Sequence, residues 1–218
     1  MRVLASLALA LALVTSADAS RARISREDAF IGYSERASPS RAAQTADALE
    51  GLALRLRTRA GAIDVTLRED WAPEMVRSIV DAVRVGGACA SETASGCNFY
   101  RAEAVPARGD VDAYGGPGPP YALLQGTFEG LGHHEREKTP PVVRRGYACL
   151  IGKGPDFFIG TRDHDEWGTA HIVFGVVSDM RAVDEIADEY PRHPETWGMT
   201  NVTVLNEKVV FTAEIVRL

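Results

Sequence analysis

The chain has 218 residues, of which 45% are hydrophobic and 25% are charged, as in a globular protein with one domain of ordinary size. This composition excludes a fibrous chain and a wholly disordered one. The formal net charge of −6 and a pI near 5.4 argue against binding to a phosphate backbone, so nucleic acid is not an expected partner.

Residues 1–19 have the pattern of a secretory signal, with Arg2, an apolar run over 3–14 and the small-x-small site Ala17-Asp-Ala19. The apolar run is shorter than the roughly 20 residues that a membrane span needs. We therefore expect a signal peptide and a protein of the secretory lumen or the cell exterior. The alternative is an uncleaved anchor that holds the protein in the Golgi or ER membrane. Residues 20–51, rich in Arg, Ser and Ala, are expected to form an arm before a compact domain at 52–218.

Alternation of apolar and polar residues over 54–58 and 63–67 predicts a β-hairpin. A helix should follow, because an apolar stripe with helical spacing runs from Val76 to Val83. Asp70 is the expected cap of this helix, with Pro73 in its first turn and a Gly-Gly pair after its end.

Short apolar runs separated by Gly and Pro follow, and each is expected to be a strand. They cover 98–102, 121–127, 147–151, 157–161 and 171–177. A second helix is predicted between Met180 and Tyr190, and two final strands, 202–205 and 209–216, are expected to flank a turn at Asn206-Glu207-Lys208. We therefore expect a mainly β protein, a closed antiparallel β-barrel capped by two α-helices.

Cys89 and Cys97 flank a short polar loop and are a candidate disulfide pair, the alternative being two free thiols. Cys149 lies in an apolar run and is expected to be buried. Asn201 begins an Asn-Val-Thr sequon and is a glycosylation candidate. No Cys/His spacing indicates a zinc site, so we expect neither a metal ion nor another cofactor.

Five segments resemble the cyclophilins, the β-barrel peptidyl-prolyl cis–trans isomerases, in order and in spacing between Leu52 and Val204. These segments are Ala72-Pro73, Phe99-Tyr-Arg101, Leu123-Leu-Gln125-Gly126, Asp156-Phe-Phe-Ile159, and Glu166-Trp167 followed by His171-Ile-Val-Phe-Gly175. The sequences of these segments are most similar to those of a divergent plant and algal branch of the family. The resemblance implies a cyclophilin-like barrel over residues 52–218.

The same resemblance implies roles for three residues in isomerisation. Arg101 takes the place of the family's catalytic arginine, Gln125 that of the glutamine that holds it, and Phe158 that of the aromatic residue on the floor of the proline pocket. A guanidinium can donate to the prolyl nitrogen only after that nitrogen becomes pyramidal, so its binding favours the transition state.

Five further positions are implied to bind substrate: Leu123, Trp167, His171, Asp156 and Ala122. Asp156 and Ala122 depart from the family, which has a glutamine and an aromatic residue there. The segment 150–153 also departs from the family's substrate-aligning sequence.

The function expected from these residues is peptidyl-prolyl isomerisation on proteins of the secretory pathway. The alternative is a non-catalytic module of the same fold that binds proline-containing segments. The expected partners are proline-containing polypeptides, with a membrane involved only if the signal segment is uncleaved, and the protein is expected to be a monomer.

Overall fold

The structure is a computed structural model that describes residues 49–93, 96–112, 115–131, 137 and 141–218. Contacts divide the chain into two units, Met1–Ser38 and Pro39–Leu218, and the described residues belong to the second unit alone. The expected signal or anchor segment 1–19, and the expected arm except for its end at 49–51, lie outside the described residues. None of the helices in the described ranges is long and apolar enough to cross a membrane.

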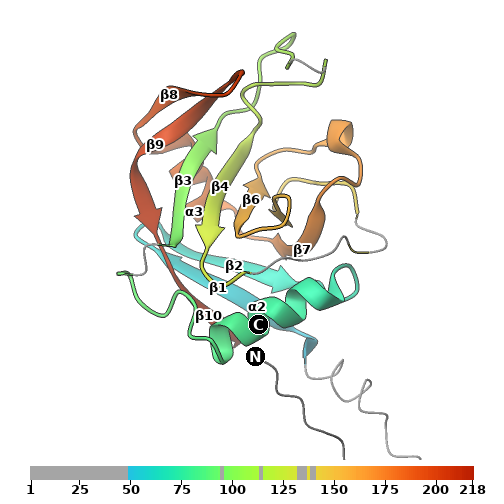
Figure 1. The fold of residues 1–218 in the computed structure, drawn as a ribbon, viewed down its shortest axis with the longest axis vertical. Coiled ribbons are helices and arrows are strands. Elements are labelled where there is room, and N and C mark those ends of the chain that lie inside the picture. Colours follow the sequence, from blue (N-terminus) through green and yellow to red (C-terminus); the bar gives the residue numbers. More distant parts are fainter. Residues whose placement is uncertain (1–48, 94–95, 113–114, 132–136, 138–140) are drawn as a thin grey trace, which may run out of the picture. The chain divides into compact units, whose positions relative to one another are not determined.

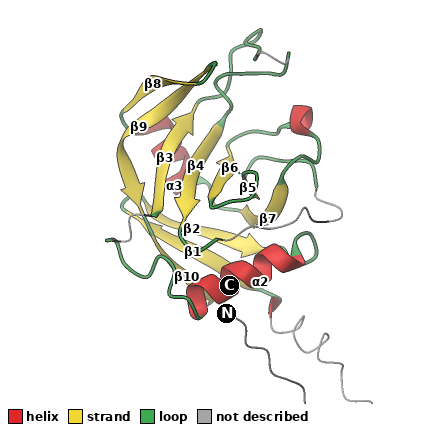
Figure 2. Cartoon of the chain, in the orientation of Figure 1, coloured by secondary structure: helices red, strands yellow, loops and turns green. Residues whose placement is uncertain are grey.

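Ten strands form one sheet in which the recorded pairings are antiparallel (Figure 1). The order across the sheet is β10-β1-β2-β7-β5-β6-β4-β3-β9-β8. The bounds are β1 (Leu52–Thr58), β2 (Gly61–Leu67), β3 (Cys97–Glu103), β4 (Leu123–Phe128), β5 (Tyr147–Leu150), β6 (Asp156–Gly160), β7 (Ile172–Val177), β8 (Arg192–Trp197), β9 (Thr200–Val210) and β10 (Thr212–Arg217). The described part is thus mainly β, as expected, with little helix (Figure 2).

Strands β1 and β2 form the predicted hairpin. Leu56 and Ile63 are opposite each other in the register and both are buried. Arg55 and Asp64 are the next opposite pair, and they form an ion pair with Nε and Oδ1 2.7 Å apart. The alternation read from the sequence therefore corresponds to one packed face and one polar face of the hairpin.

Helix α2 (Pro73–Arg84) begins at Pro73, where the missing N–H costs nothing because the first N–H groups of a helix have no partner in the helix. The predicted cap was wrong. Ala72 occupies the N-cap position without a side-chain cap bond, and Asp70 instead accepts a hydrogen bond from Arg68 Nε at 2.8 Å. Asp70 lies too early, because a capping side chain must come from the residue directly before the first helical turn.

The second predicted helix is present in a different form. Only Arg181–Asp184 is α-helical (α3), and Glu185–Glu189 continues as a π-helical turn (η2). This helical segment packs against β2, β3 and β4, whereas α2 packs against β10. Both contribute buried side chains to one hydrophobic core.

The C-terminal part corrects the prediction in two respects. The predicted turn at Asn206-Glu207-Lys208 is wrong, since these residues continue the eleven-residue strand β9. Its partner β8 was not predicted, and together they form the β8–β9 hairpin. Every residue of β8 is exposed or half-buried, so the strand has no apolar alternation by which to recognise it.

The recorded pairings do not close the sheet, because the order begins at β10 and ends at β8. The expected closed barrel is therefore not shown. The chain itself links the two sides, since β9 pairs with β3, β10 pairs with β1, and only Phe211 separates β9 from β10. The N–H of Phe211 donates to the carbonyl of Cys97 at 3.1 Å, and the N–H of Ala213 to that of Cys89 at 2.9 Å. Cys89 and Cys97 form a disulfide, which lies against this bend.

The centre of the core is a group of phenylalanines, called here the inner aromatic core. Its members are Phe99, Phe128, Phe157, Phe174 and Phe211. The ring of Phe157 lies 5.6 to 6.4 Å from each of the other four. Offset and edge contacts at such separations add to the free energy of burial.

Candidate functional site

Arg101, Gln125 and Phe158 lie in one row across three adjacent strands. Arg101 on β3 is the register partner of Gln125 on β4, and Gln125 is the partner of Phe158 on β6. Directly opposite residues lie on the same face of a sheet with Cβ atoms about 4.5–5.5 Å apart. The pairing therefore brings the three predicted residues together.

A β-bulge shapes the β3 end of this row. The register of β3 shifts between Phe99 and Arg101, and a bulge allows two consecutive side chains to face the same side. Accordingly, Gln125 contacts both residues of the bulge. Its Oε1 accepts from Arg101 Nη1 at 2.8 Å, and its Nε2 donates to the Tyr100 hydroxyl.

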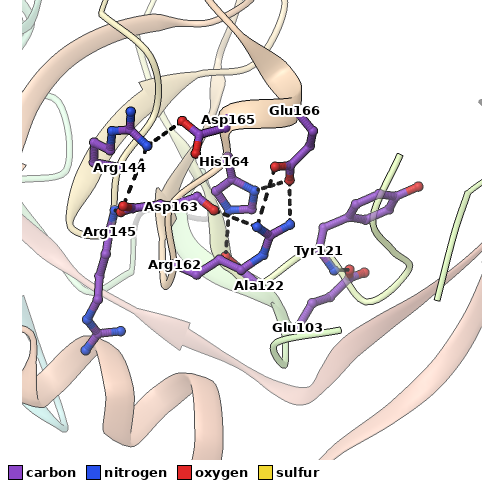
Figure 3. Close-up of polar contacts among 10 residues, drawn as sticks. All are labelled: Glu103, Tyr121, Ala122, Arg144, Arg145, Arg162, Asp163, His164, Asp165 and Glu166. Atoms are coloured by element: carbon purple, nitrogen blue, oxygen red, sulfur yellow. Dashed lines mark hydrogen bonds and ion pairs between the residues drawn. The ribbon is translucent and has the colours of Figure 1, made fainter. Parts of the chain in front are cut away.

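The guanidinium of Arg101 is held in place by Glu103, whose side chain is completely buried. Arg101 Nε donates to Glu103 Oε1 at 2.8 Å. The same carboxylate accepts from the backbone N–H of Tyr121 at 2.6 Å, a contact visible in Figure 3, and from that of Thr203 at 3.2 Å. Glu103 thus links Arg101 to the backbone of Tyr121, just before β4, and to the backbone of Thr203 in β9. Glu103 was not among the residues predicted for the site, although its position two residues after Arg101 places both on one face of a strand.

Two aromatic rings lie close to the guanidinium of Arg101. The Cζ atom of Arg101 is 5.7 Å from the ring centroid of Tyr121 and 5.2 Å from that of Trp197. The arginine side chain is only 12% exposed as a result of these contacts. Its Nη2 forms no hydrogen bond with the residues that the structure describes, so its N–H groups remain available to a ligand.

Phe158 is the centre of a second apolar group, called here the outer aromatic cluster. Leu123, Val143, Cys149 and Val173 form its base together with Phe158, and Tyr121 and Trp167 pack against it. The ring of His171 lies 5.0 Å from that of Phe158 and 5.3 Å from that of Trp167. Burial lowers the pKa of His171 below its ordinary value of 6.5, so the ring is neutral at pH 7.

A buried histidine supports the rim of this cluster. His164 is completely buried and its ring stacks on that of Trp167, with centroids 3.7 Å apart. Figure 3 shows its two nitrogens bound, Nδ1 to Glu166 Oε1 at 2.9 Å and Nε2 to the carbonyl of Ala122 at 3.2 Å. Arg162 forms an ion pair with the same Glu166. This network could not be predicted from the sequence, because its members converge only through the turn of η1 (Asp165–Trp167).

Ala122 is placed away from the surface that a substrate would contact. It is completely buried, has a φ of +50°, and interacts through its backbone, whose carbonyl accepts from Thr161 N–H at 2.9 Å as well as from His164. Its predicted side-chain contact with substrate therefore has no geometric support. Leu123, Trp167 and His171, in contrast, all adjoin Phe158.

Asp156 lies outside the outer aromatic cluster. It pairs with Thr127 at the start of β6 and lines a separate cavity with Tyr100. Asn201, the glycosylation candidate, is exposed near the turn of the β8–β9 hairpin, where its Oδ1 accepts from Thr196 Oγ1 at 3.0 Å. Neither residue contributes to the row of Arg101, Gln125 and Phe158.

The site thus combines a positioned cation, an amide and an apolar cluster with aromatic rings at its rim. Within the described ranges, no group of three His, Cys, Asp or Glu side chains could hold a metal ion. These groups can seat an apolar ring and donate hydrogen bonds to an atom that gains a lone pair during reaction.

No protein-family model matches the chain, and neither does any curated protein. Two crystal structures of a Cryptosporidium parvum cyclophilin-type peptidyl-prolyl cis–trans isomerase are similar to it, one in the presence of the dipeptide Ala-Pro. Both are 13% identical with a TM-score of 0.47, and the match covers 72% of this chain and 96% and 98% of theirs. A hypothetical protein from Archaeoglobus fulgidus is 16% identical with a TM-score of 0.37, covering 77% of this chain and 95% of that one. Because TM-scores below 0.5 do not establish a shared fold, the proposals for function rest on the geometry of the site.

Proposed function

We propose that this protein is a peptidyl-prolyl cis–trans isomerase that acts on X–Pro bonds of polypeptides. The observation that carries the proposal is the row of Arg101, Gln125 and Phe158, in which a hydrogen-bonded guanidinium borders an apolar aromatic cluster. The cluster around Phe158 offers a surface of the right chemistry for a pyrrolidine ring, since its buried members are apolar and the rings of Tyr121 and Trp167 at its rim are only partly buried.

The reaction needs the X–Pro amide to lose its resonance, which opposes rotation with a barrier of about 20 kcal/mol. Halfway through rotation the prolyl nitrogen becomes pyramidal and gains a lone pair. Arg101 Nη2 donates to that lone pair, while Nε and Nη1 are occupied by Glu103 and Gln125 and so fix the plane of the guanidinium. The interaction exists only near the transition state, so it lowers the barrier rather than stabilising the bound substrate.

A second candidate function is a non-catalytic module that binds proline-containing segments. Two observations favour it. The carboxylate of Glu103 neutralises Arg101 inside the protein, and Phe158 is only 1% exposed beneath its aromatic neighbours. A module of this kind would bind peptides without increasing the rate of isomerisation.

We further propose that the protein acts in the secretory pathway. The expected signal segment 1–19 supports this proposal, and so does the Cys89–Cys97 disulfide, because disulfides persist in oxidising compartments. Mass spectrometry of the N-terminus of the cell-derived protein would separate a cleaved signal from a retained anchor. An intact N-terminus on a cytosolic protein would contradict the proposal.

The test of the enzymatic function uses the full chain with its disulfide intact and a proline-containing tetrapeptide observed by NMR exchange. We expect Arg101→Ala to lower kcat/KM about 100-fold, the size of effect of losing one positioned donor. Arg101→Lys keeps the charge but loses the planar donor fork, so we expect a loss of about tenfold. Arg55→Lys is the matched control, since Arg55 also forms an ion pair on a strand, with Asp64 on β2.

Two outcomes would overturn the proposal. Binding of the peptide by the native protein without a rise in its isomerisation rate would establish the binding module instead. Alternatively, folded Arg101→Ala protein with the native rate would show that this arginine takes no part in the reaction. Urea unfolding of each variant would verify that it is folded.

A further inference from the structure

A cavity of about 480 Å³ lies between the β8–β9 hairpin and the β3–β4–β6 part of the sheet. We call it the hairpin cavity, and its lining includes Tyr100, Thr127, Asp156, Glu195, Trp197 and Lys208. The lining side chains of β8 alternate along the strand, as expected when one face of a hairpin covers a hollow, and β9 contributes Val204, Leu205, Asn206 and Lys208. It is separate from the outer aromatic cluster around Phe158.

The hairpin cavity adjoins the proposed active site through a shared side chain. Trp197 lines the cavity, its ring lies 6.3 Å from that of Tyr100, and Arg101 Cζ lies 5.2 Å from it. The strand register also places the cavity near Arg101. Arg101 pairs with Val204, and Val204 pairs with His193, which lines the cavity. Two strand spacings amount to about 10 Å, which an extended peptide covers in about three residues.

The chemistry of the lining favours a cation. Asp156 and Glu195 contribute two carboxylates, whereas Lys208 contributes one ammonium group and His193 an imidazole whose Nε2 lies 3.3 Å from Glu195 Oε1. Glu195 is held in place because its Oε2 accepts from Trp197 Nε1 at 2.9 Å. Burial, and then the negative charge of Asp156, raise the pKa of Tyr100 to about 12, so the phenol stays protonated and adds no competing charge.

We propose that the hairpin cavity binds a lysine or arginine side chain of the polypeptide whose proline occupies the outer aromatic cluster, about three residues from that proline. The two carboxylates would pair with the cation, and the faces of Tyr100 and Trp197 would pack on its methylene groups and its charge. The inference rests on the proposed binding of proline-containing segments, and it narrows the substrate class to segments with a basic residue near the proline.

The test is a set of matched peptides with one central proline and lysine, norleucine or glutamate three residues before or after it. Affinity for the full chain is measured by fluorescence anisotropy, and isomerisation by NMR exchange. We expect the lysine peptide to bind about tenfold more tightly than the glutamate peptide on one side of the proline. The norleucine peptide should lie between them, because it keeps the methylene groups without the charge.

Three variants assign the preference to the hairpin cavity. Asp156→Asn combined with Glu195→Gln should reduce the lysine-to-glutamate ratio to about one, and Lys208→Gln should increase it two- to threefold. Glu207→Gln is the control, because Glu207 lies on the same strand as Lys208, pairs with Arg59 and does not line the cavity. Asp156→Asn alone should lower the ratio as well, and it leaves the bond between Glu195 and Trp197 intact.

Equal affinities for the three peptides on both sides of the proline would overturn the inference, and so would a preference that the double variant does not change. Lysine preference in binding without any turnover would leave the inference standing and contradict only the enzymatic function. Turnover without lysine preference would contradict the inference and leave the enzymatic function standing. The two proposals therefore fail separately.

Discussion

Phe157 and Phe158 are consecutive residues on β6, yet they belong to two different regions of the molecule. Phe157 is surrounded by the other four rings of the inner aromatic core, whereas Phe158 contacts Trp167 and His171 in the outer aromatic cluster. Both side chains are 1% exposed. Burial alone therefore does not distinguish a core residue from a site residue. The two are distinguished by the side chains that surround them.

The two regions differ in the chemistry of their members. The inner core is built from phenylalanines, which have no polar atom that needs a partner. The outer cluster includes amphipathic rings at its rim and is bordered by Arg101, Gln125 and Glu103. This difference suggests that the first region determines stability and the second determines ligand binding.

The largest expected effect is the loss of stability when either phenylalanine is substituted by alanine. Phe157→Ala should lower the free energy of unfolding by about 3–5 kcal/mol, because it leaves a cavity among four rings that cannot collapse together. Phe158→Ala should cost less, about 2 kcal/mol, since half-buried neighbours can move into the space. Urea unfolding measures both changes.

Function should respond in the opposite order to stability. Phe158→Leu should weaken binding of a proline peptide at least tenfold, whereas Phe157→Leu should leave it unchanged while both proteins remain folded. Equal losses of affinity in the two variants would show that the inner and outer regions are not separable.

Glu103 connects the site to the body of the protein, and Glu103→Gln should have an intermediate effect. We expect a loss of stability of about 2 kcal/mol, because a buried ion pair becomes a neutral contact. The guanidinium would also lose its fixed plane, so kcat should fall about tenfold while KM stays nearly the same. Asp64→Asn is the control, since it removes an arginine partner in the β1–β2 hairpin, away from the site. A rise in KM at constant kcat would contradict a positioning role.

The smallest expected effect is on the pH dependence of stability. Burial lowers the pKa of His171 and of His164 below 6.5 in the folded protein. The unfolded chain therefore binds more protons below about pH 6.5, and the free energy of unfolding should decrease as the pH falls from 7 to 5. His171→Gln should flatten this dependence, whereas Phe157→Leu should lower stability equally at each pH. A native stability that is constant over this range would contradict the prediction.

The features that could be predicted from the sequence are those with a local pattern. Alternation gave the β1–β2 hairpin, and the order of short motifs brought Arg101, Gln125 and Phe158 into one site. The features that could not be predicted depend on tertiary contacts. Strand β8 has no buried residue and is a strand only because β9 pairs with it. His164 receives its partners from a distant carbonyl and a turn, which no spacing in the sequence reveals.

The one-residue connection between β9 and β10 has a consequence for folding during synthesis. Strand β10 lies beside β1, and β9 lies beside β3, so the sheet stays incomplete until the chain as far as Arg217 has left the ribosome. Pairing strands so distant in sequence is slow, and slow folding leaves apolar segments unprotected. We therefore expect the nascent chain to depend on chaperones until β10 has paired with β1.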